Sequence, residues 1–121
     1  MSGAIEVQVF GVQKSADTRK ALRFFAERRV RVHFVDLRER AASLGELRRF
    51  AQKFGVEALI DRSSKRFGDL GLASARQSDE RWLQRLADEP LILRVPLVRQ
   101  QQRLSIGLAE DQWREWLGLL E

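Results

Sequence analysis

The sequence contains no cysteine, and this absence excludes all chemistry that depends on a thiol. Without cysteine there is no disulfide, no thiolate nucleophile and no thiolate metal site. The single histidine leaves too few further soft ligands for a zinc or copper centre. We therefore expect no bound metal and no redox chemistry through a thiol.

Long apolar runs are missing as well. No segment approaches the roughly 20 consecutive apolar residues that span a bilayer, and the N-terminal residues lack the basic and apolar parts of a secretion signal. We expect a cytoplasmic protein with no membrane contact. The length of 121 residues and the hydrophobic content of 44% suit one compact domain, residues 1–121.

Positive charge is in excess, with a formal net charge of +5. The acidic residues are interspersed with the basic ones, so charge only weakly favours a polyanionic partner. A basic run accompanies the first expected helix: Arg19, Lys20, Arg23, Arg28, Arg29 and Arg31. A solvated helical face explains this run, and no cluster of exposed aromatic residues is expected to stack bases. Docking to an acidic protein or to nucleic acid through this run stays open as an alternative, but nucleic acid is not the expected partner.

The first third of the chain has the pattern of a βαβ unit. Alternating apolar residues predict a strand over 5–10, and helical spacing predicts a helix over 16–29. One face of this helix is expected to carry Ala21, Leu22, Phe25, Ala26 and Arg29. A β-branched and aromatic run over 30–35 predicts a second strand, parallel to the first. Ligands tend to bind at the carboxyl ends of such strands, where the loop 11–15 lies.

Further elements follow in the order helix, helical turns, helix, hairpin, helix. Ser43 and Glu46 have the spacing of a capping box, and Gly55 is expected to end the helix that they begin. Short helical turns are expected over 57–60 and 66–70, and a helix that begins at Ser78 or Asp79 ends before Pro90. The apolar stretches 91–93 and 97–98, with 103–106 after a polar turn, indicate a hairpin. The last helix has an apolar stripe at i, i+3, i+4 and i+7, which is typical of core packing: Trp113, Trp116, Leu117 and Leu120.

Three separated stretches, residues 10–21, 91–98 and 106–113, resemble the arsenate reductase-like (ArsC/Spx/YffB-type) family of the thioredoxin fold. They are similar, in that order, to the active-site loop with its helix opening, to the Leu-Ile-x-Arg-Pro segment, and to the Gly-to-Trp link into the last helix. Residues 59–62 and 67–70 resemble positions in the insertion of that family. The resemblance implies an α/β, thioredoxin-like fold: a central mixed four-stranded sheet, flanking helices and a helical insertion over about 40–88.

The resemblance also implies where a site would lie. Ser15 stands where the catalytic cysteine of the family would be, and Pro96 matches a proline that is cis beside the active site. The oxyanion-binding arginine before that proline falls on Val95, with Arg94 displaced by one residue. A neighbouring residue on a strand faces the other way, so we expect that Arg94 does not replace it directly.

A second oxyanion-binding arginine of the arsenate reductases falls on Asp61, whereas Arg62 matches an arginine of the YffB-like subgroup. Arsenate reduction is therefore doubtful on two further counts. His33 is interpreted as a surface or rim residue.

Two interpretations of Ser15 stay open. It can be a helix N-cap and nothing else, or it can form an anion pocket with Lys14 and Arg19 at the start of the helix. The loop lacks the second glycine and the spacing of a nucleotide-binding P-loop. Arg62, Arg94 and Pro96 complete the set of candidate ligand-binding residues.

The leading hypothesis is a redox-inactive ArsC/Spx-like protein that serves as a binding or regulatory module. Spx-type relatives bind RNA polymerase, so a transcriptional adaptor is one form of this hypothesis, by analogy alone. The alternative is an arsenate reductase or glutathione-dependent thiol reductase, with Ser15 differently used or standing in for a natural cysteine. A third interpretation is binding of nucleic acid. No cofactor is expected, and glutathione or a small anion enters as a ligand through the resemblance only.

Overall fold

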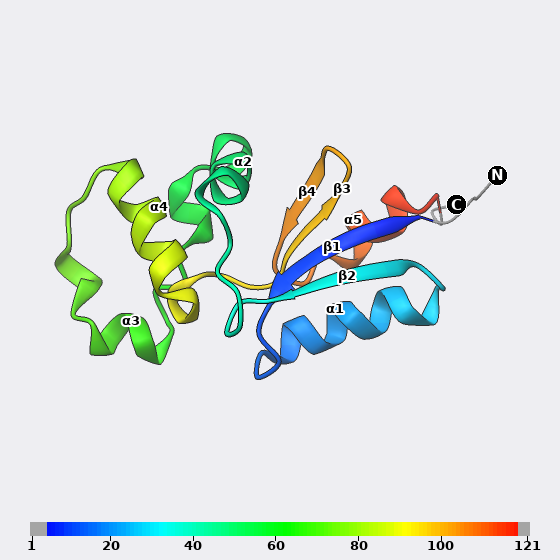
Figure 1. Ribbon diagram of the computed structural model, residues 1–121, viewed down its shortest axis with the longest axis horizontal. Helices are drawn as coiled ribbons and strands as arrows, with labels where there is room; N and C mark the ends of the chain where they lie inside the picture. Colours follow the sequence, from blue (N-terminus) through cyan, green and yellow to red (C-terminus); the bar gives the residue numbers. More distant parts are fainter. Residues whose placement is uncertain (1–4, 119–121) are drawn as a thin grey trace. The chain divides into compact units, whose positions relative to one another are not determined.

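A mixed four-stranded sheet organises both ends of the chain in the computed structural model, which describes residues 5–118. Its strands are β1 (Glu6–Gly11), β2 (Arg31–Asp36), β3 (Leu97–Gln100) and β4 (Arg103–Ile106). The strand order is β2-β1-β3-β4, with β1 and β2 parallel and the other neighbours antiparallel (Figure 1). This is the mixed four-stranded sheet that the family resemblance implies, and it contains the parallel βαβ unit that the residue pattern predicts.

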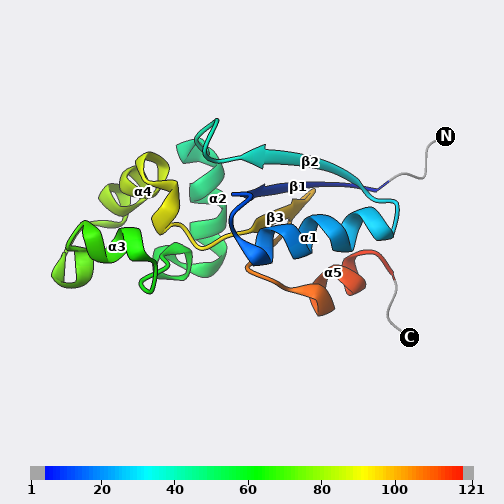
Figure 2. The same cartoon turned by 90° about the horizontal axis from the view of Figure 1, so that it is seen from below.

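Helices α1 (Ala16–Glu27) and α5 (Glu110–Trp116) pack on the same face of this sheet (Figure 2). The buried core between the helices and the sheet consists of Val7, Val9, Ala21, Phe24, Phe25, Val98 and Trp113. The ring of Trp113 lies 5.3 Å from that of Phe24 and 5.0 Å from that of Phe25, between centroids. The expected core role of Trp113 is thus confirmed. Trp116 and Leu117 are partly buried, and Leu120 lies outside the described residues.

The buried face of α1 differs from the expected one. Thr18 and Phe24 are buried together with Ala21 and Phe25, whereas Ala26 is exposed. Arg29, which was expected on the same face, lies beyond the helix with φ 59° and is exposed. Thr18 and Phe24 fill the space against the sheet, so the buried stripe lies closer to the N-terminus of the helix than expected.

Residues Arg38–Arg94 form a second compact unit, and the first unit consists of Met1–Leu37 and Val95–Glu121. The helices of the second unit are α2 (Leu44–Phe54), α3 (Lys65–Asp69) and α4 (Asp79–Asp88), with short 3-10 turns at Val56–Leu59, Leu72–Ser74 and Pro90–Ile92. The expected insertion, about 40–88, falls within this second unit. None of the helices in the part of the chain that the structure describes is long and apolar enough to cross a membrane.

Serine hydroxyls begin all three helices of the second unit. Ser43, Ser64 and Ser78 each accept a hydrogen bond from the backbone N–H three residues further on, at 3.1, 3.1 and 3.2 Å. Of the two residues expected to cap α4, Ser78 is therefore the N-cap. Gly55 ends α2 as expected, with a φ of 87° that favours glycine.

The hairpin is confirmed, but its first arm is shorter than the sequence indicates. β3 and β4 pair over Leu97–Gln100 and Arg103–Ile106 around a turn at residues 101–102. Residues 91–92 lie instead in a 3-10 turn, and Leu93 makes a single antiparallel bridge with Ile60. Pro90 at the start of this turn has the fixed φ of a helical first position, which explains why an apolar run became a turn.

Candidate functional site

The candidate site of the first unit begins at the carboxyl end of β1. There the chain turns sharply into α1, and Ser15 N–H donates to the Val12 carbonyl at 3.0 Å to close the turn. Antiparallel pairing of Phe10 with Leu97 brings the neighbouring Pro96 next to Gly11 at the start of this loop. The Val95–Pro96 peptide bond is cis, as the resemblance implies.

Ser15 is the N-cap of α1. Its backbone is extended (φ −75°, ψ 122°), and its Oγ accepts a hydrogen bond from the Thr18 N–H at 3.0 Å. Within residues 5–118, no basic side chain forms a hydrogen bond with this hydroxyl. A serine hydroxyl without a neighbouring base stays protonated and is a weak nucleophile. The position that the resemblance gives to a catalytic thiol is therefore used here to stabilise the start of a helix.

Two basic side chains accompany Ser15. Arg19 is exposed, and its Nη1 donates to the Gln13 carbonyl at 2.6 Å, which folds the side chain back over the loop. Lys14 is exposed in the loop itself. Asp17, in the first turn of α1, adds a negative charge at the same end of the helix. The structure thus gathers Lys14, Ser15 and Arg19 at the end of the sheet where the register places the cis-proline, with one acid among them.

Gly11 and Thr18 make the closest approach in this region, which the sequence analysis missed. A Cβ on Gly11 would lie 2.5 Å from the Thr18 Oγ1, so only glycine fits without displacing the buried Thr18 side chain. Thr18 is fully buried, and its hydroxyl has no hydrogen-bond partner in the described residues. A glycine at the end of a buried strand was the available signal for this close contact.

Arg62, in the second unit, is held by neighbours of its own unit. Its guanidinium donates through Nε and Nη2 to the two carboxylate oxygens of Glu57, the latter bond at 3.0 Å. It also lies over the rings of Phe67 and Trp82, at 5.4 and 6.0 Å from their centroids. The hydrogen bonds from Arg62 hold the pKa of the Glu57 carboxyl below its usual value. One edge of the guanidinium is therefore occupied by a structural ion pair.

Arg94 also belongs to the second unit, but the physical reason given for setting it aside was wrong. Arg94 does not lie on a strand: its N–H donates to the Leu59 carbonyl at 2.7 Å, just after the bridge made by Leu93. Its side chain is exposed and has no partner within residues 5–118. The strand argument about opposite faces therefore does not apply to it.

His33 lies exposed on β2, as expected of a surface residue. Its Nδ1 is 3.5 Å from the Gln8 Nε2 on the neighbouring strand. Among the described residues, no group of three or more histidine, aspartate or glutamate side chains is placed to hold a metal ion. His33 is therefore a rim residue of the sheet and takes no part in the loop around Ser15.

The parallel βαβ unit, the antiparallel hairpin, two helices on one face and a cis-proline beside the first loop together define the thioredoxin-like class of folds. The ArsC family profile matches residues 10–116, which is most of the sequence. The chain belongs to the ArsC family.

Two relatives show how distant the similarity is. The chain is 24% identical over 106 residues to the uncharacterized protein YusI of Bacillus subtilis, covering 84% of this chain and 90% of that protein. It is 24% identical over 113 residues to a protein named global transcriptional regulator Spx 2, from Oceanobacillus iheyensis, covering 92% of this chain and 83% of that protein.

Two solved structures share the fold. The structure of a YFFB protein superposes with a TM-score of 0.82 at 19% identity, covering 90% of this chain and 96% of that one. An arsenate reductase from Vibrio cholerae superposes with a TM-score of 0.78 at 21% identity, covering 98% of this chain and 100% of that one. At these identities the similarity establishes the fold alone, and any argument about activity has to come from the residues of the site.

Proposed function

We propose that this protein is a redox-inactive member of the ArsC family that works as a binding or regulatory module. One observation carries the proposal: the hydroxyl of Ser15, the residue that the resemblance places at the position of the nucleophile, caps α1. A serine cannot form a mixed disulfide with glutathione or with a resolving cysteine, and the sequence contains no other thiol. A thiol-dependent catalytic cycle has no chemical starting point in this chain.

The exposed surface near Ser15 supports a binding role. Lys14 and Arg19 are exposed and present positive charge there. The similarity to a protein named as a transcriptional regulator makes transcription the most concrete setting. We propose RNA polymerase as the partner and the cytoplasm as the location.

Direct binding to purified RNA polymerase tests the partner. We expect saturable binding of the wild-type chain in biolayer interferometry. The double variant Lys14→Glu, Arg19→Glu is expected to weaken binding by about tenfold or more. In this proposal an acidic surface of the partner lies against these two residues, and negative charges facing each other across an interface lower the affinity. The matched control Arg49→Glu reverses an exposed arginine on α2 and should leave the affinity within about twofold. No binding by the wild-type chain would refute the RNA polymerase proposal.

Membership of the ArsC family favours one rival, a reductase that uses Ser15 in another way. Glutathione-dependent reduction of arsenate by the wild-type chain distinguishes the two functions: we expect none, and turnover would overturn the redox-inactive proposal. The variant Ser15→Cys restores a thiol at the start of α1, where the helix dipole lowers a thiol pKa. Activity of this variant would show that only the nucleophile was lost, and its inactivity would show that the rest of the pocket has changed too.

A further inference from the structure

Strand β2 lies at one edge of the sheet, and its outer side carries unpaired backbone groups (Figure 1). The Arg31 N–H points toward β1, because it donates to the Ile5 carbonyl at 2.9 Å. Backbone groups alternate in direction along a strand, so those of Val32 and Phe34 point away from β1. Within residues 5–118 these outward N–H and C=O groups have no backbone partner. They form a row of donors and acceptors that another strand can use.

The two faces of this edge differ in their chemistry. Val32 and Phe34 lie on the face that the helices cover, where they pack against the core but remain partly exposed. Leu22 of α1, which the sequence pattern places on the buried face, packs against the same core and is also covered only in part. Arg31 and His33 lie on the opposite face of β2 and are exposed. A strand added to this edge would meet apolar side chains on one face, and an arginine and a histidine on the other.

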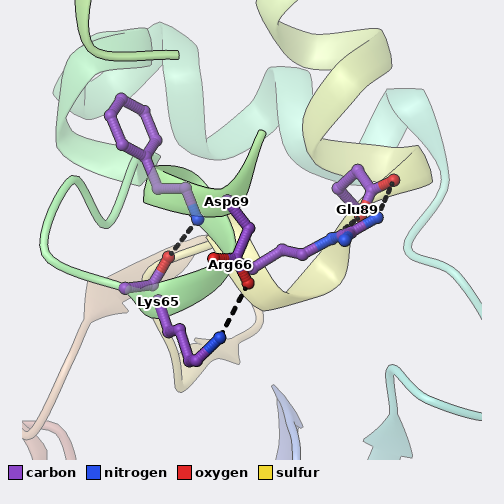
Figure 3. A network of polar contacts seen from close by, with 6 residues as sticks. Lys65, Arg66, Asp69 and Glu89 are labelled. Atoms are coloured by element: carbon purple, nitrogen blue, oxygen red, sulfur yellow. Dashed lines mark hydrogen bonds and ion pairs between the residues drawn. The ribbon is translucent and has the colours of Figure 1, made fainter. Parts of the chain in front are cut away.

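The ion pair of Arg31 is loose enough to yield to a partner. In the second unit, by comparison, Arg66 holds Glu89 with two hydrogen bonds, at 2.8 and 3.2 Å (Figure 3). Arg31 Nη1 is 3.5 Å from the Glu6 Oε2, and the two side chains are 73% and 63% exposed. An exposed pair of this kind contributes little free energy. Arg31 can therefore exchange Glu6 for a carboxylate on an incoming strand.

We propose that the outer edge of β2 binds an extended peptide segment of a partner protein, in which apolar and acidic residues alternate. The segment adds one strand to the sheet through backbone hydrogen bonds to Val32 and Phe34. Its apolar side chains pack beside these two residues, and its acidic side chains pair with Arg31 and His33 on the other face. A second copy of this chain fits less well, because two β2 edges paired about a twofold axis bring their basic side chains together. The edge shares no residue with the surface near Ser15, so this binding does not depend on RNA polymerase as a partner.

Two synthetic peptides with blocked termini test the edge on the full chain, one of alternating valine and glutamate and one of alternating valine and lysine. In a nitrogen-15 NMR titration, we expect the glutamate peptide to shift the Val32 and Phe34 amide signals saturably. It should also slow hydrogen exchange of these two outward amides several-fold. Exchange of the Arg31 and His33 amides, which point toward β1, should stay as it is. The lysine peptide should bind at least about tenfold more weakly.

Four results of these titrations would overturn the proposal. Absence of a saturable shift at Val32 and Phe34 would remove the site. Equal affinity for the two peptides would remove the acidic partner. Equal slowing of exchange at every amide of β2 would indicate general stabilisation and not an added strand. Dimer formation by the chain alone, with the same two amides protected, would assign the edge to a second copy.

Variants separate strand addition from attraction by charge. Val32→Pro removes one outward N–H and no bond to β1, which is where an edge strand tolerates proline; it should weaken the glutamate peptide about tenfold or more. Arg31→Glu should weaken the glutamate peptide to a similar extent and strengthen the lysine peptide, which gives a second measurement if circular dichroism shows Val32→Pro to be unfolded. The matched control Arg23→Glu makes the same charge change at an exposed position of α1 and should leave both affinities within about twofold. Wild-type affinity in Arg31→Glu, or in a folded Val32→Pro, would refute the proposal.

Discussion

Replacement of Ser15 by alanine removes the hydroxyl oxygen that accepts a hydrogen bond from the Thr18 N–H and leaves this N–H without a side-chain partner at the start of α1. Loss of a serine N-cap typically costs about 1 kcal/mol, within a range of roughly 0.5 to 2. Ser15 is half-buried, so water replaces the lost acceptor only in part. We expect the free energy of unfolding to fall by about 1 kcal/mol, and Tm to fall by roughly 4 °C for a chain of this size.

Two further substitutions sharpen the test. Ser15→Asn provides another side-chain acceptor of comparable N-cap strength. The free energy of unfolding of this variant should therefore lie within about 0.3 kcal/mol of the wild-type value. Ser74→Ala is the matched control, because Ser74 is exposed at the end of a 3-10 turn and has no side-chain hydrogen bond in the described residues. It should leave the stability unchanged.

Urea unfolding followed by tryptophan fluorescence gives the global stability, and amide hydrogen exchange isolates the local effect. The Thr18 amide should exchange several-fold faster in Ser15→Ala than in the wild type, because its hydrogen bond is lost. If Ser15→Ala unfolds at the wild-type urea concentration, or if Ser15→Asn is as unstable as Ser15→Ala, the capping role of Ser15 is refuted.

Three other outcomes are expected. Thr18→Val replaces a buried, unpaired hydroxyl by a methyl group and should raise the free energy of unfolding by about 1 kcal/mol. Trp113→Phe and Ser105→Ala each break the buried 2.8 Å hydrogen bond from the indole Nε1 to the serine Oγ, so in urea unfolding the double variant should lose about 1 kcal/mol less than the sum of the single ones. Hydrogen bonds from Arg66 lower the pKa of Glu89, so this carboxylate stabilises the fold above its unfolded pKa and the contribution disappears as the pH falls through the lower, folded pKa. Glu89→Gln should therefore flatten the loss of stability in acid, measured by thermal unfolding from neutral pH downward.

Each of these expectations has a result that contradicts it. A Thr18→Val variant less stable than the wild type would mean that the hydroxyl has a partner. Strict additivity of Trp113→Phe and Ser105→Ala would deny that their hydrogen bond contributes. For the acid titration, Glu115→Gln is the control, since Glu115 is an exposed residue of α5 without an ion pair in the described residues; equal flattening by both variants would refute the ion-pair explanation.

Local patterns predicted much of the fold, because they express local physics. The alternation over 5–10 and the capping serine at Ser43 led to a strand and a helix at nearly those positions. The cis-proline is different: no local pattern at Pro96 indicates a cis bond, and only the resemblance to a family supplied it. Structure that depends on neighbouring residues can thus be predicted from one sequence. Structure that depends on the whole fold, such as this cis bond, is predicted through resemblance to a family.

The failures involve contacts that no local pattern encodes. Apolar residues at 91–93 have strand composition, but Pro90 at the preceding position begins a 3-10 turn that includes residues 91–92, and only Leu93 makes a β-bridge, with the distant Ile60. The partner of Arg62 was not foreseen, because Glu57 lies five residues away and reaches it only through the irregular turn between them. The burial of Thr18 depends on how closely α1 approaches Gly11, which is a tertiary distance.

The sheet register fixes where the inserted segment leaves and rejoins the sheet. Asp36 ends β2 beside Gly11, and β3 begins on the other flank of the same strand, since Leu97 pairs with Phe10. Departure and return are thus separated by two interstrand spacings, about 10 Å. Three to four extended residues span such a gap. Evolution, or an engineer, could therefore exchange everything between residues 38 and 94 for a short linker or a foreign module while preserving the strand pairing beneath.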